Sequence, residues 1–291
     1  MIEKPIFIIG CNRSGTTLLF RNLSEHPELW SLYVEAQDVF HSQFPVDAVE
    51  GERVSGPAEL PAESAVREGL YQQAHNKEAF QDRLILGQVP PRLVQRPLNR
   101  LYKPSVIRLV EKTPANSLRI PFLVAAFPDA QFIYVVRRGE AVVSSLMEGW
   151  KRWNNAPAGE PFEYRKWHYL TPPGWREYVD KPLESICAFQ WIESNRFAYD
   201  DLEALASSRY LLVRHEDLVG DPASAYGRIT QFCELPDSAY FDKVVARANS
   251  RAYTTGGSAP RRDKWRQIHG PEIERIRDQL APINELFYGG D

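Results

Sequence analysis

The sequence has few cysteines, no long apolar run and no excess of basic residues. Its three cysteines, Cys11, Cys187 and Cys233, are odd in number and widely spaced, which excludes a disulfide framework and the paired spacing of a zinc site. No apolar run reaches the length of a membrane span. Lys and Arg number 35 against 38 Asp and Glu, a net charge of −3, so no general basic surface is available for nucleic acid. An anionic ligand must therefore meet a local cluster of basic side chains.

What remains is an ordinary globular composition of 291 residues, 43% hydrophobic and 25% charged. We expect one large α/β domain over residues 1–291, with insertions at about 38–105 and 150–180 that carry no motif. The first residues lack a basic segment followed by a cleavable apolar one, and the cysteine content suits a reducing compartment, so we expect a cytoplasmic protein. The sequence does not indicate an oligomeric state.

The chain is organised around residues 5–24. The apolar run Ile6–Ile9 predicts a buried strand, a turn of small residues follows, and a helix begins at Thr16 or Thr17 and ends near Glu25. A strand, a glycine-bounded loop and a helix N-terminus together form a geometry that binds phosphate, because backbone N–H groups and the helix dipole favour an anion there. The alternative is a plain tight turn.

The spacing of Gly10 and Gly15 matches the nucleotide phosphate loop, but Thr16 stands where that loop needs Lys. The missing Lys argues against an ATPase, GTPase or kinase. Arg13 supplies a cation that can bind two oxygens of an anion. Cys11, in the same loop, is either a reactive thiol or a small residue that fills the turn.

This stretch, Gly-x-x-Arg-Ser-Gly-Thr-Thr-Leu-Leu after an apolar strand, resembles the 5′-phosphosulfate loop of sulfotransferases that use 3′-phosphoadenosine 5′-phosphosulfate (PAPS). The likeness is to the bacterial and tyrosylprotein-type branch, which usually has Pro where this chain has Asn12. The resemblance implies that the donor is held by Arg13, Ser14, Gly15, Thr16 and Thr17, with Arg13 also catalytic.

Glu35 is the first candidate for a catalytic base. It follows a predicted second strand, Leu29–Val34, and tyrosylprotein-type enzymes carry their base just after this strand, although Glu35 lies one residue further along than that pattern. The alternative is a solvated glutamate at a strand end. His168 is a second candidate base, but a lone histidine in an aromatic loop is more often structural.

Lys112 follows another apolar run, Val106–Val110, at the place where a parallel strand would meet a ligand. The resemblance implies that Lys112 bonds the bridging oxygen of the leaving group; a surface lysine is the alternative. Asn116, at the start of the next helix, either orients the site or caps that helix.

Arg137 follows the clearest predicted strand, Gln131–Val136, and Ser145 lies eight residues later on a predicted helix. This pair resembles the 3′-phosphate site of the family, and an arginine with a nearby hydroxyl can share a phosphate dianion. Arg138 occupies a position that is commonly Asp in relatives.

The C-terminal third carries weaker signals. The strand Tyr210–Val213 leads into Arg-His-Glu-Asp-Leu, which resembles the Tyr-Glu-Asp-Leu segment of relatives and implies that His215 lies near the nucleotide. Lys264 and Trp265 follow a loop that, in relatives, closes over the 3′-phosphate and adenine. Helical spacing predicts further helices over Pro61–Ala79, Leu183–Leu205 and Pro271–Leu286.

The resemblance implies a P-loop-like α/β fold, a three-layer sandwich of a mostly parallel sheet between helices. It also implies transfer of a sulfuryl group from PAPS, leaving 3′-phosphoadenosine 5′-phosphate (PAP), to an acceptor hydroxyl rather than an amine, with no metal. The acceptor would be a small molecule, carbohydrate or lipid, met by residues 38–105 and by the aromatic-rich residues 150–180. A lid held down by its own aromatic side chains is the alternative for the second segment. A small-molecule kinase or nucleotide hydrolase, and a PAP-binding or PAPS-binding protein without chemistry, are the alternatives.

Overall fold

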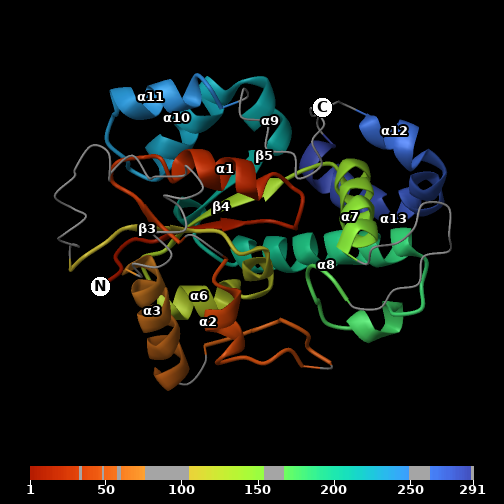
Figure 1. Cartoon of the computed structure of the whole chain (residues 1–291), viewed down its shortest axis with the longest axis horizontal. Helices are drawn as coiled ribbons and strands as arrows, with labels where there is room; N and C mark the ends of the chain where they lie inside the picture. Colours follow the sequence, from red (N-terminus) through yellow and green to blue (C-terminus); the bar gives the residue numbers. More distant parts are fainter. Residues whose placement is uncertain are drawn as a thin grey trace.

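A computed structural model describes residues 1–32, 35–47, 49–57, 60–75, 105–153, 167–248 and 263–289. Over these ranges five parallel strands form one sheet in the order β2-β3-β1-β4-β5 (Figure 1). The strands are β1 (Ile6–Ile9), β2 (Trp30–Ser31), β3 (Leu109–Glu111), β4 (Gln131–Val136) and β5 (Tyr210–Arg214). β1 lies at the centre, and its four residues are completely buried, as a strand covered on both faces requires.

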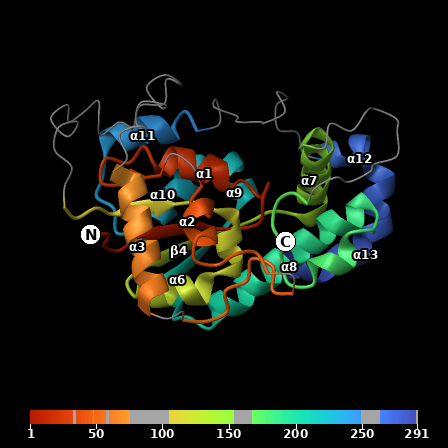
Figure 2. The ribbon, with the colours of Figure 1, turned by 60° about the horizontal axis from the view of Figure 1, so that its bottom comes forward.

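Helices cover both faces of the sheet (Figures 1 and 2). Ile6 and Ile8 of β1 pack into one core with α1 (Thr16–Leu23), α9 (His215–Gly220), α10 (Pro222–Phe232) and α11 (Ala239–Val245). Phe7 and Ile9 pack into the opposite core with α2 (Gln37–His41), α3 (Leu60–His75) and α6 (Ile120–Ala126). Successive residues of a strand point to opposite faces, so four apolar residues in a row build both cores. The predicted three-layer P-loop-like arrangement is confirmed.

A third core lies beside the sheet. It joins α7 (Gly139–Trp153), α8 (Leu183–Glu203) and α13 (Gly270–Tyr288) around the completely buried Trp150 and Trp191 (Figure 1). The short α12 (Lys264–Ile268) packs against α7 and α13. Single helical turns of 3₁₀ type occur at Pro114–Leu118, Trp175–Tyr178 and Ser207–Arg209. This core fixes α7, which carries Ser145, relative to the strand that precedes it.

Several predicted boundaries were wrong by a few residues. α1 ends at Leu23, two residues before the predicted end. β2 is shorter than predicted, since the N–H of Leu29 already donates to His26 O in a turn, 3.1 Å away. The strand predicted over Val106–Val110 begins later, because Ile107 exchanges backbone hydrogen bonds with Met1 and Glu3 instead. Val34 and Ala79, the predicted ends of β2 and α3, lie outside the described residues.

All five strands run in the same direction, so their carboxyl ends share one edge of the sheet. The segments that leave this edge include the loop after β1, Lys112 after β3, Arg137 after β4 and His215 after β5. Ligands of open α/β sheets bind at this edge. The fold therefore brings the four sequence motifs to one place.

Candidate functional site

The loop after β1 is a tight turn that two glycines make possible. Gly10 and Gly15 have φ angles of 149° and 99°. A Cβ atom on Gly15 would lie 2.3 Å from Nδ1 of His215, and one on Gly10 would lie 2.5 Å from the carbonyl oxygen of Val135. Any larger residue would push apart the strand ends that meet here. Between the glycines, Arg13 also adopts a left-handed backbone, with φ 71°, a conformation that costs a non-glycine residue free energy.

The small residues of the loop face different surroundings. Ser14 is completely buried, and its Oγ has no hydrogen-bond partner among the described residues. Thr16 is buried, and its methyl group lies beneath Gly10. Thr17 is exposed at the first turn of α1. Thr16 thus supports the loop from below, whereas Ser14 holds a buried hydroxyl that a ligand oxygen could satisfy.

Arg13, Arg137 and Ser145 come together although more than 120 residues separate the first from the others. Nε of Arg13 donates to Oγ of Ser145 at 2.9 Å, and Nη1 of Arg137 donates to the carbonyl oxygen of Arg13 at 3.1 Å. The two anion motifs predicted from separate parts of the sequence therefore form one cluster. We call Arg13–Gly15, Arg137, Ser145 and His215 the anion cradle.

The electrostatics of the anion cradle favour a negatively charged ligand. Burial lowers the pKa of Arg137, the carboxylate of Glu216 acts in the opposite direction, and the neighbouring guanidinium of Arg13 lowers the pKa further. Two adjacent guanidinium groups in a poorly solvated site repel each other. An anion between them would remove that repulsion and accept charge-assisted hydrogen bonds.

His215 closes the anion cradle as a neutral ring. Burial, and then the charge of Arg137, lower its pKa from 6.5 to about 3, so the imidazole carries no charge near neutral pH. Nδ1 is buried against Gly15 and has no hydrogen-bond partner in the described part of the chain. A neutral imidazole can donate or accept one hydrogen bond at this position. The unsatisfied atoms of His215 and Ser14, together with the two guanidinium groups, fit an anionic nucleotide such as PAPS.

Glu35 and Lys112 meet in an ion pair, with Oε1 of the carboxylate on Nζ of the ammonium. The lysine side chain is 7% exposed and the glutamate side chain 46% exposed. β3, which Lys112 follows, is the neighbour of β1, so the pair lies beside the loop that carries Arg13. A carboxylate and an ammonium group thus stand next to the anion cradle, the former open to solvent. Glu35 therefore reaches Lys112 although it lies one residue further along the chain than the family pattern places the base.

Sequence reasoning missed Glu111, the residue before Lys112. Its buried carboxylate accepts hydrogen bonds from Oγ1 of Thr113 and Nδ2 of Asn116, both at 2.5 Å. Burial raises its pKa to about 7. Thr113 in turn accepts from the N–H of Ala36 at 2.8 Å, which ties the Glu35 segment to β3. The sequence did offer one signal for Glu111, namely a charged residue at the end of a buried apolar strand. Asn116 orients this group and does not cap a helix with its side chain.

Cys11 and His168 lie in packed surroundings. Burial raises the pKa of the Cys11 thiol to about 12, which favours a small residue filling the turn over a reactive thiol. The ring of His168 packs between Trp150 and Trp153, with centroids 5.4 and 6.2 Å away. Glu35, beside Lys112, is better placed for proton transfer than this ring.

Lys264 and Trp265 begin α12, which packs against α7 and α13. The indole of Trp265 packs against the core shared by α7, α8 and α13, with the guanidinium of Arg266 4.5 Å above it. The predicted closing loop, residues 251–262, lies outside the described residues. Contact of Lys264 and Trp265 with a nucleotide therefore stays a prediction.

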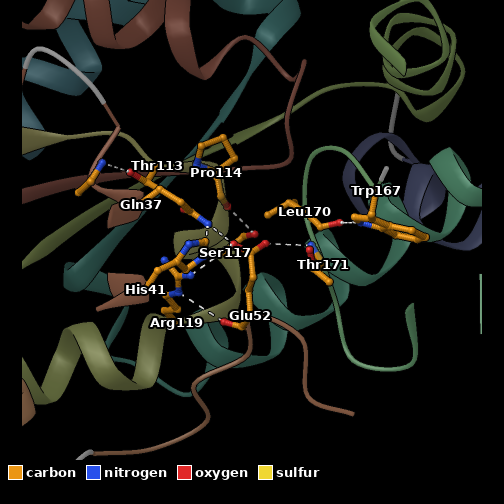
Figure 3. Close-up of polar contacts among 11 residues, drawn as sticks. Gln37, His41, Glu52, Thr113, Pro114, Ser117, Arg119, Trp167, Leu170 and Thr171 are labelled. Atoms are coloured by element: carbon orange, nitrogen blue, oxygen red, sulfur yellow. Dashed lines mark hydrogen bonds and ion pairs between the residues drawn. The ribbon is translucent and has the colours of Figure 1, made fainter. Parts of the chain in front are cut away.

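A second polar cluster, centred on Glu52, had no sequence motif (Figure 3). The carboxylate of Glu52 is buried and accepts from Gln37, from Nη2 of Arg119 at 3.4 Å and from the N–H of Thr171 at 2.9 Å, and His41 lies 3.3 Å from it. The N–H of Glu52 donates to Thr171 O at 2.8 Å.

Backbone contacts extend this cluster into a larger assembly. Gly174 N donates to Val49 O at 3.2 Å, and a Cβ on Gly51 would lie only 2.0 Å from Thr171 O. Residues 49–54 and 171–175 therefore form one unit, which we call the Glu52 unit. It joins the two segments that the sequence left without motif. Only three-dimensional proximity reveals it, because its halves are more than 100 residues apart.

Within the described ranges, no group of three or more His, Cys, Asp and Glu side chains is arranged to hold a metal ion, and no helix is both long and apolar enough to cross a membrane. The chemical groups of the site are two guanidinium groups, a neutral imidazole, serine hydroxyls and an ammonium–carboxylate pair. Such a set can hold a phosphorylated or sulfated ligand and accept a proton beside it.

Comparison with known proteins identifies the family of this chain. Residues 5–239 match the model of a family described as "Sulfotransferase family". The chain is 27% identical over 226 residues to omega-hydroxy-beta-dihydromenaquinone-9 sulfotransferase Stf3 of Mycobacterium bovis, which covers 69% of this chain and 54% of that protein. It is 24% identical over 243 residues to protein-tyrosine sulfotransferase A of Caenorhabditis elegans, covering 82% and 51%. The chain thus spans about half the length of these curated relatives.

A solved structure is similar in fold. The crystal structure of sulfotransferase STF1 from Mycobacterium tuberculosis H37Rv superposes with a TM-score of 0.52 at 16% sequence identity, covering 97% of this chain and 77% of that one. At this identity the likeness concerns the fold alone. It agrees with the parallel sheet and the helical layers described above.

Proposed function

The chain belongs to the sulfotransferase family, and from that premise we propose that it transfers the sulfuryl group of PAPS to an acceptor hydroxyl. The observation that carries the proposal is the anion cradle, in which Arg13, Arg137 and Ser145 are linked by hydrogen bonds at the carboxyl edge of the sheet. Thr16, in place of the lysine of nucleotide triphosphate loops, disfavours a kinase.

Each group of the site has a role in this proposal. PAPS supplies a sulfuryl group on a phosphate leaving group. Arg13 and the backbone N–H groups of the loop bind the 5′-phosphosulfate, and Arg137 with Ser145 binds the 3′-phosphate. Lys112 neutralises the charge that develops on the leaving phosphate. Glu35, whose side chain is half exposed, takes the proton from the acceptor hydroxyl.

The acceptor is proposed to be a hydroxyl of a small molecule or lipid. One relative is named for a hydroxylated menaquinone and the other for a protein tyrosine, and both of these carry a hydroxyl group. Gln37, two residues after Glu35, bonds Glu52, so the Glu52 unit adjoins the proposed base. We propose that this unit forms part of the acceptor side, within the insertions expected at about 38–105 and 150–180 of a single domain.

Calorimetric titration with PAP, and with ATP and magnesium as the competing ligand, tests the proposal. We expect PAP to bind in the micromolar range and ATP not to bind. Arg137→Ala removes a charge-assisted contact and should weaken PAP binding by about tenfold or more. Arg138→Ala is the matched control, because the adjacent guanidinium lies over the ring of Tyr288, 4.3 Å from its centroid, outside the anion cradle.

Binding of ATP without binding of PAP would overturn the proposal and restore the kinase alternative. Binding of PAP without turnover of PAPS, across a panel of hydroxylated lipids, phenols and sugars, would instead indicate a protein that binds the nucleotide without chemistry. An equal loss of PAP affinity in the Arg137 and Arg138 variants would show that the anion cradle does not hold the ligand.

A further inference from the structure

One face of α7 carries both a residue of the anion cradle and an unexpected glycine. Ser145, which accepts from Arg13, lies one helical turn before Gly149. A Cβ atom on Gly149 would lie only 1.6 Å from the hydroxyl oxygen of Tyr169. Glycine is unfavourable in a helix interior, so its presence in α7 needs a reason. The reason in this structure is that the Tyr169 hydroxyl rests against the helix at Gly149, one turn from Ser145.

Tyr169 has a strained backbone. Its φ angle is 64°, in the left-handed region that residues with a Cβ rarely adopt, and Arg13 of the anion cradle shares this conformation with φ 71°. Strained residues persist only where the surroundings fix them, and they gather at functional sites. Two such residues, more than 150 positions apart in the chain, reach neighbouring turns of α7: Arg13 bonds Ser145, and the Tyr169 hydroxyl lies against Gly149.

The surroundings of Tyr169 hold it firmly in this conformation. The side-chain amide of Gln190, completely buried in α8, donates to the carbonyl oxygens of His168 and Leu170, both at 2.7 Å. Trp167 Nε1 also donates to Leu170 O at 2.8 Å. The residues on either side of Tyr169 are thus anchored to the core, and the tyrosine between them cannot relax without breaking these bonds.

The hydroxyl of Tyr169 is arranged as a hydrogen-bond donor. The indole of Trp153 lies beside this hydroxyl and can only donate a hydrogen bond, so the phenol proton is left for another acceptor. Burial raises the pKa of Tyr169, while the nearby guanidinium of Arg13 acts in the opposite direction. The Tyr169 hydroxyl therefore stays protonated near neutral pH. The guanidinium of Arg13 lies nearby, so an anion bound there can accept hydrogen bonds from both groups.

We infer that the Tyr169 hydroxyl is a further ligand-binding group of the anion cradle, which donates to an oxygen of the 3′-phosphate that Arg137 and Ser145 are proposed to hold. The inference rests on the proposed function, since it takes the ligand to be PAP or PAPS. It assigns a structural reason to Gly149, whose missing side chain leaves room for this hydroxyl. It also gives the aromatic segment around residues 167–169 a role in binding the donor.

The test compares PAP affinities by calorimetry in four single variants. Tyr169→Phe removes only the hydroxyl and should weaken PAP binding by about tenfold, the usual effect of losing a hydrogen bond to a charged group. Gly149→Ala should weaken it to a similar degree, because the new methyl group displaces the hydroxyl. Tyr178→Phe and Gly227→Ala are the matched controls. Tyr178 stacks on Phe189 in the same region, and Gly227, in helix α10, has nothing within 4 Å of an added Cβ.

A double variant makes the result specific. If both substitutions act through the same hydroxyl, Gly149→Ala in the Tyr169→Phe background should add little further loss of affinity. Wild-type affinity for PAP in Tyr169→Phe would overturn the inference while leaving the proposed function intact. Fully additive losses would overturn it as well, since they would mean that the two residues act independently. Absence of PAP binding in the wild-type protein would refute the proposed function and the inference together.

Discussion

The anion cradle and the Glu52 unit are built in opposite ways. The anion cradle sits on short segments that directly follow strands, so each of its residues is placed by local sequence and by one strand of the sheet. The Glu52 unit joins two irregular segments, which the buried carboxylate of Glu52 and backbone hydrogen bonds at Thr171 and Gly174 hold together. Substitutions should therefore separate ligand binding from local stability.

The largest expected effect falls between the two regions, at Glu35. Glu35→Gln removes the proposed base without changing its size, and we expect turnover to drop by about a hundredfold or more, the usual contribution of a general base. PAP affinity should stay within about twofold, because the anion cradle does not include this residue. Steady-state kinetics and calorimetry on one preparation measure both quantities. Asp38→Asn, on the exposed part of α2, is the control. Normal turnover in Glu35→Gln would remove this residue from the mechanism.

The next effect belongs to the Glu52 unit alone. Glu52→Ala leaves the guanidinium of Arg119, 1% exposed, without its charged partner, which should lower the free energy of unfolding by about 3 kcal/mol. Denaturant unfolding measures this loss. Glu50→Ala changes an exposed glutamate of the same segment and should cost little. PAP affinity should be preserved in both, and a parallel loss of PAP affinity in Glu52→Ala would contradict the separation of the two regions.

A smaller effect, dependent on pH, belongs to the anion cradle alone. The folded-state pKa of His215 is about 3, below the ordinary 6.5, so the unfolded chain takes up a proton first as the pH falls. The folded state has its full stability above about pH 6.5 and loses it progressively toward pH 3. His215→Gln removes this proton uptake, and the loss of stability should become shallower by up to about 1.4 kcal/mol per pH unit.

Denaturant unfolding at several pH values between about 7 and 4 tests this expectation. His26, whose pKa is also lowered by burial, is present in both proteins and cancels from the comparison. Identical pH dependence in the two proteins would show that His215 ionises in the folded state much as it does in the unfolded chain.

The smallest effect concerns the thiols. All three cysteines are buried, and burial raises the pKa of Cys11 to about 12, so the thiolate that reacts with alkylating agents is scarce. Iodoacetamide should leave the native protein unmodified by mass spectrometry and its PAP affinity unchanged, while it modifies the cysteines of the urea-unfolded chain. Rapid labelling of Cys11 in the native protein would instead identify it as a reactive thiol of the loop after β1.

The sequence allowed the anion cradle to be predicted because phosphate binding depends on local features. A glycine-bounded turn between a strand and a helix needs only consecutive residues, and Arg137 and Ser145 belong to one strand–helix junction. Parallel strands then bring the junctions together without any further information. The same reasoning found the sheet, since β1 and β4 are buried apolar runs that can hardly be anything else.

Glu52, Glu111 and Tyr169 escaped prediction for different physical reasons. Glu52 acts through Arg119 and Thr171, which are distant in sequence, so no local pattern marks it. Glu111 sits at the end of a strand where a charge is expected to face solvent, yet it is buried by Thr113 and Asn116. Tyr169 stands in an aromatic segment in which many residues simply pack. The edge strand β2 was predicted too long because only two of its residues find a partner in β3.

The pairing of Thr171 with Glu52 has a consequence for redesign of the protein. Neither residues 49–54 nor residues 171–175 can be exchanged alone for the corresponding segment of a relative, since the transplanted piece would arrive without the carboxylate or the backbone groups that dock it. Gly51 tightens the restriction, because its backbone touches Thr171 so closely that no side chain fits. The two segments form a single cassette. Chimaeras made with new acceptor preferences in mind must transfer both at once, although the chain separates them by more than a hundred residues.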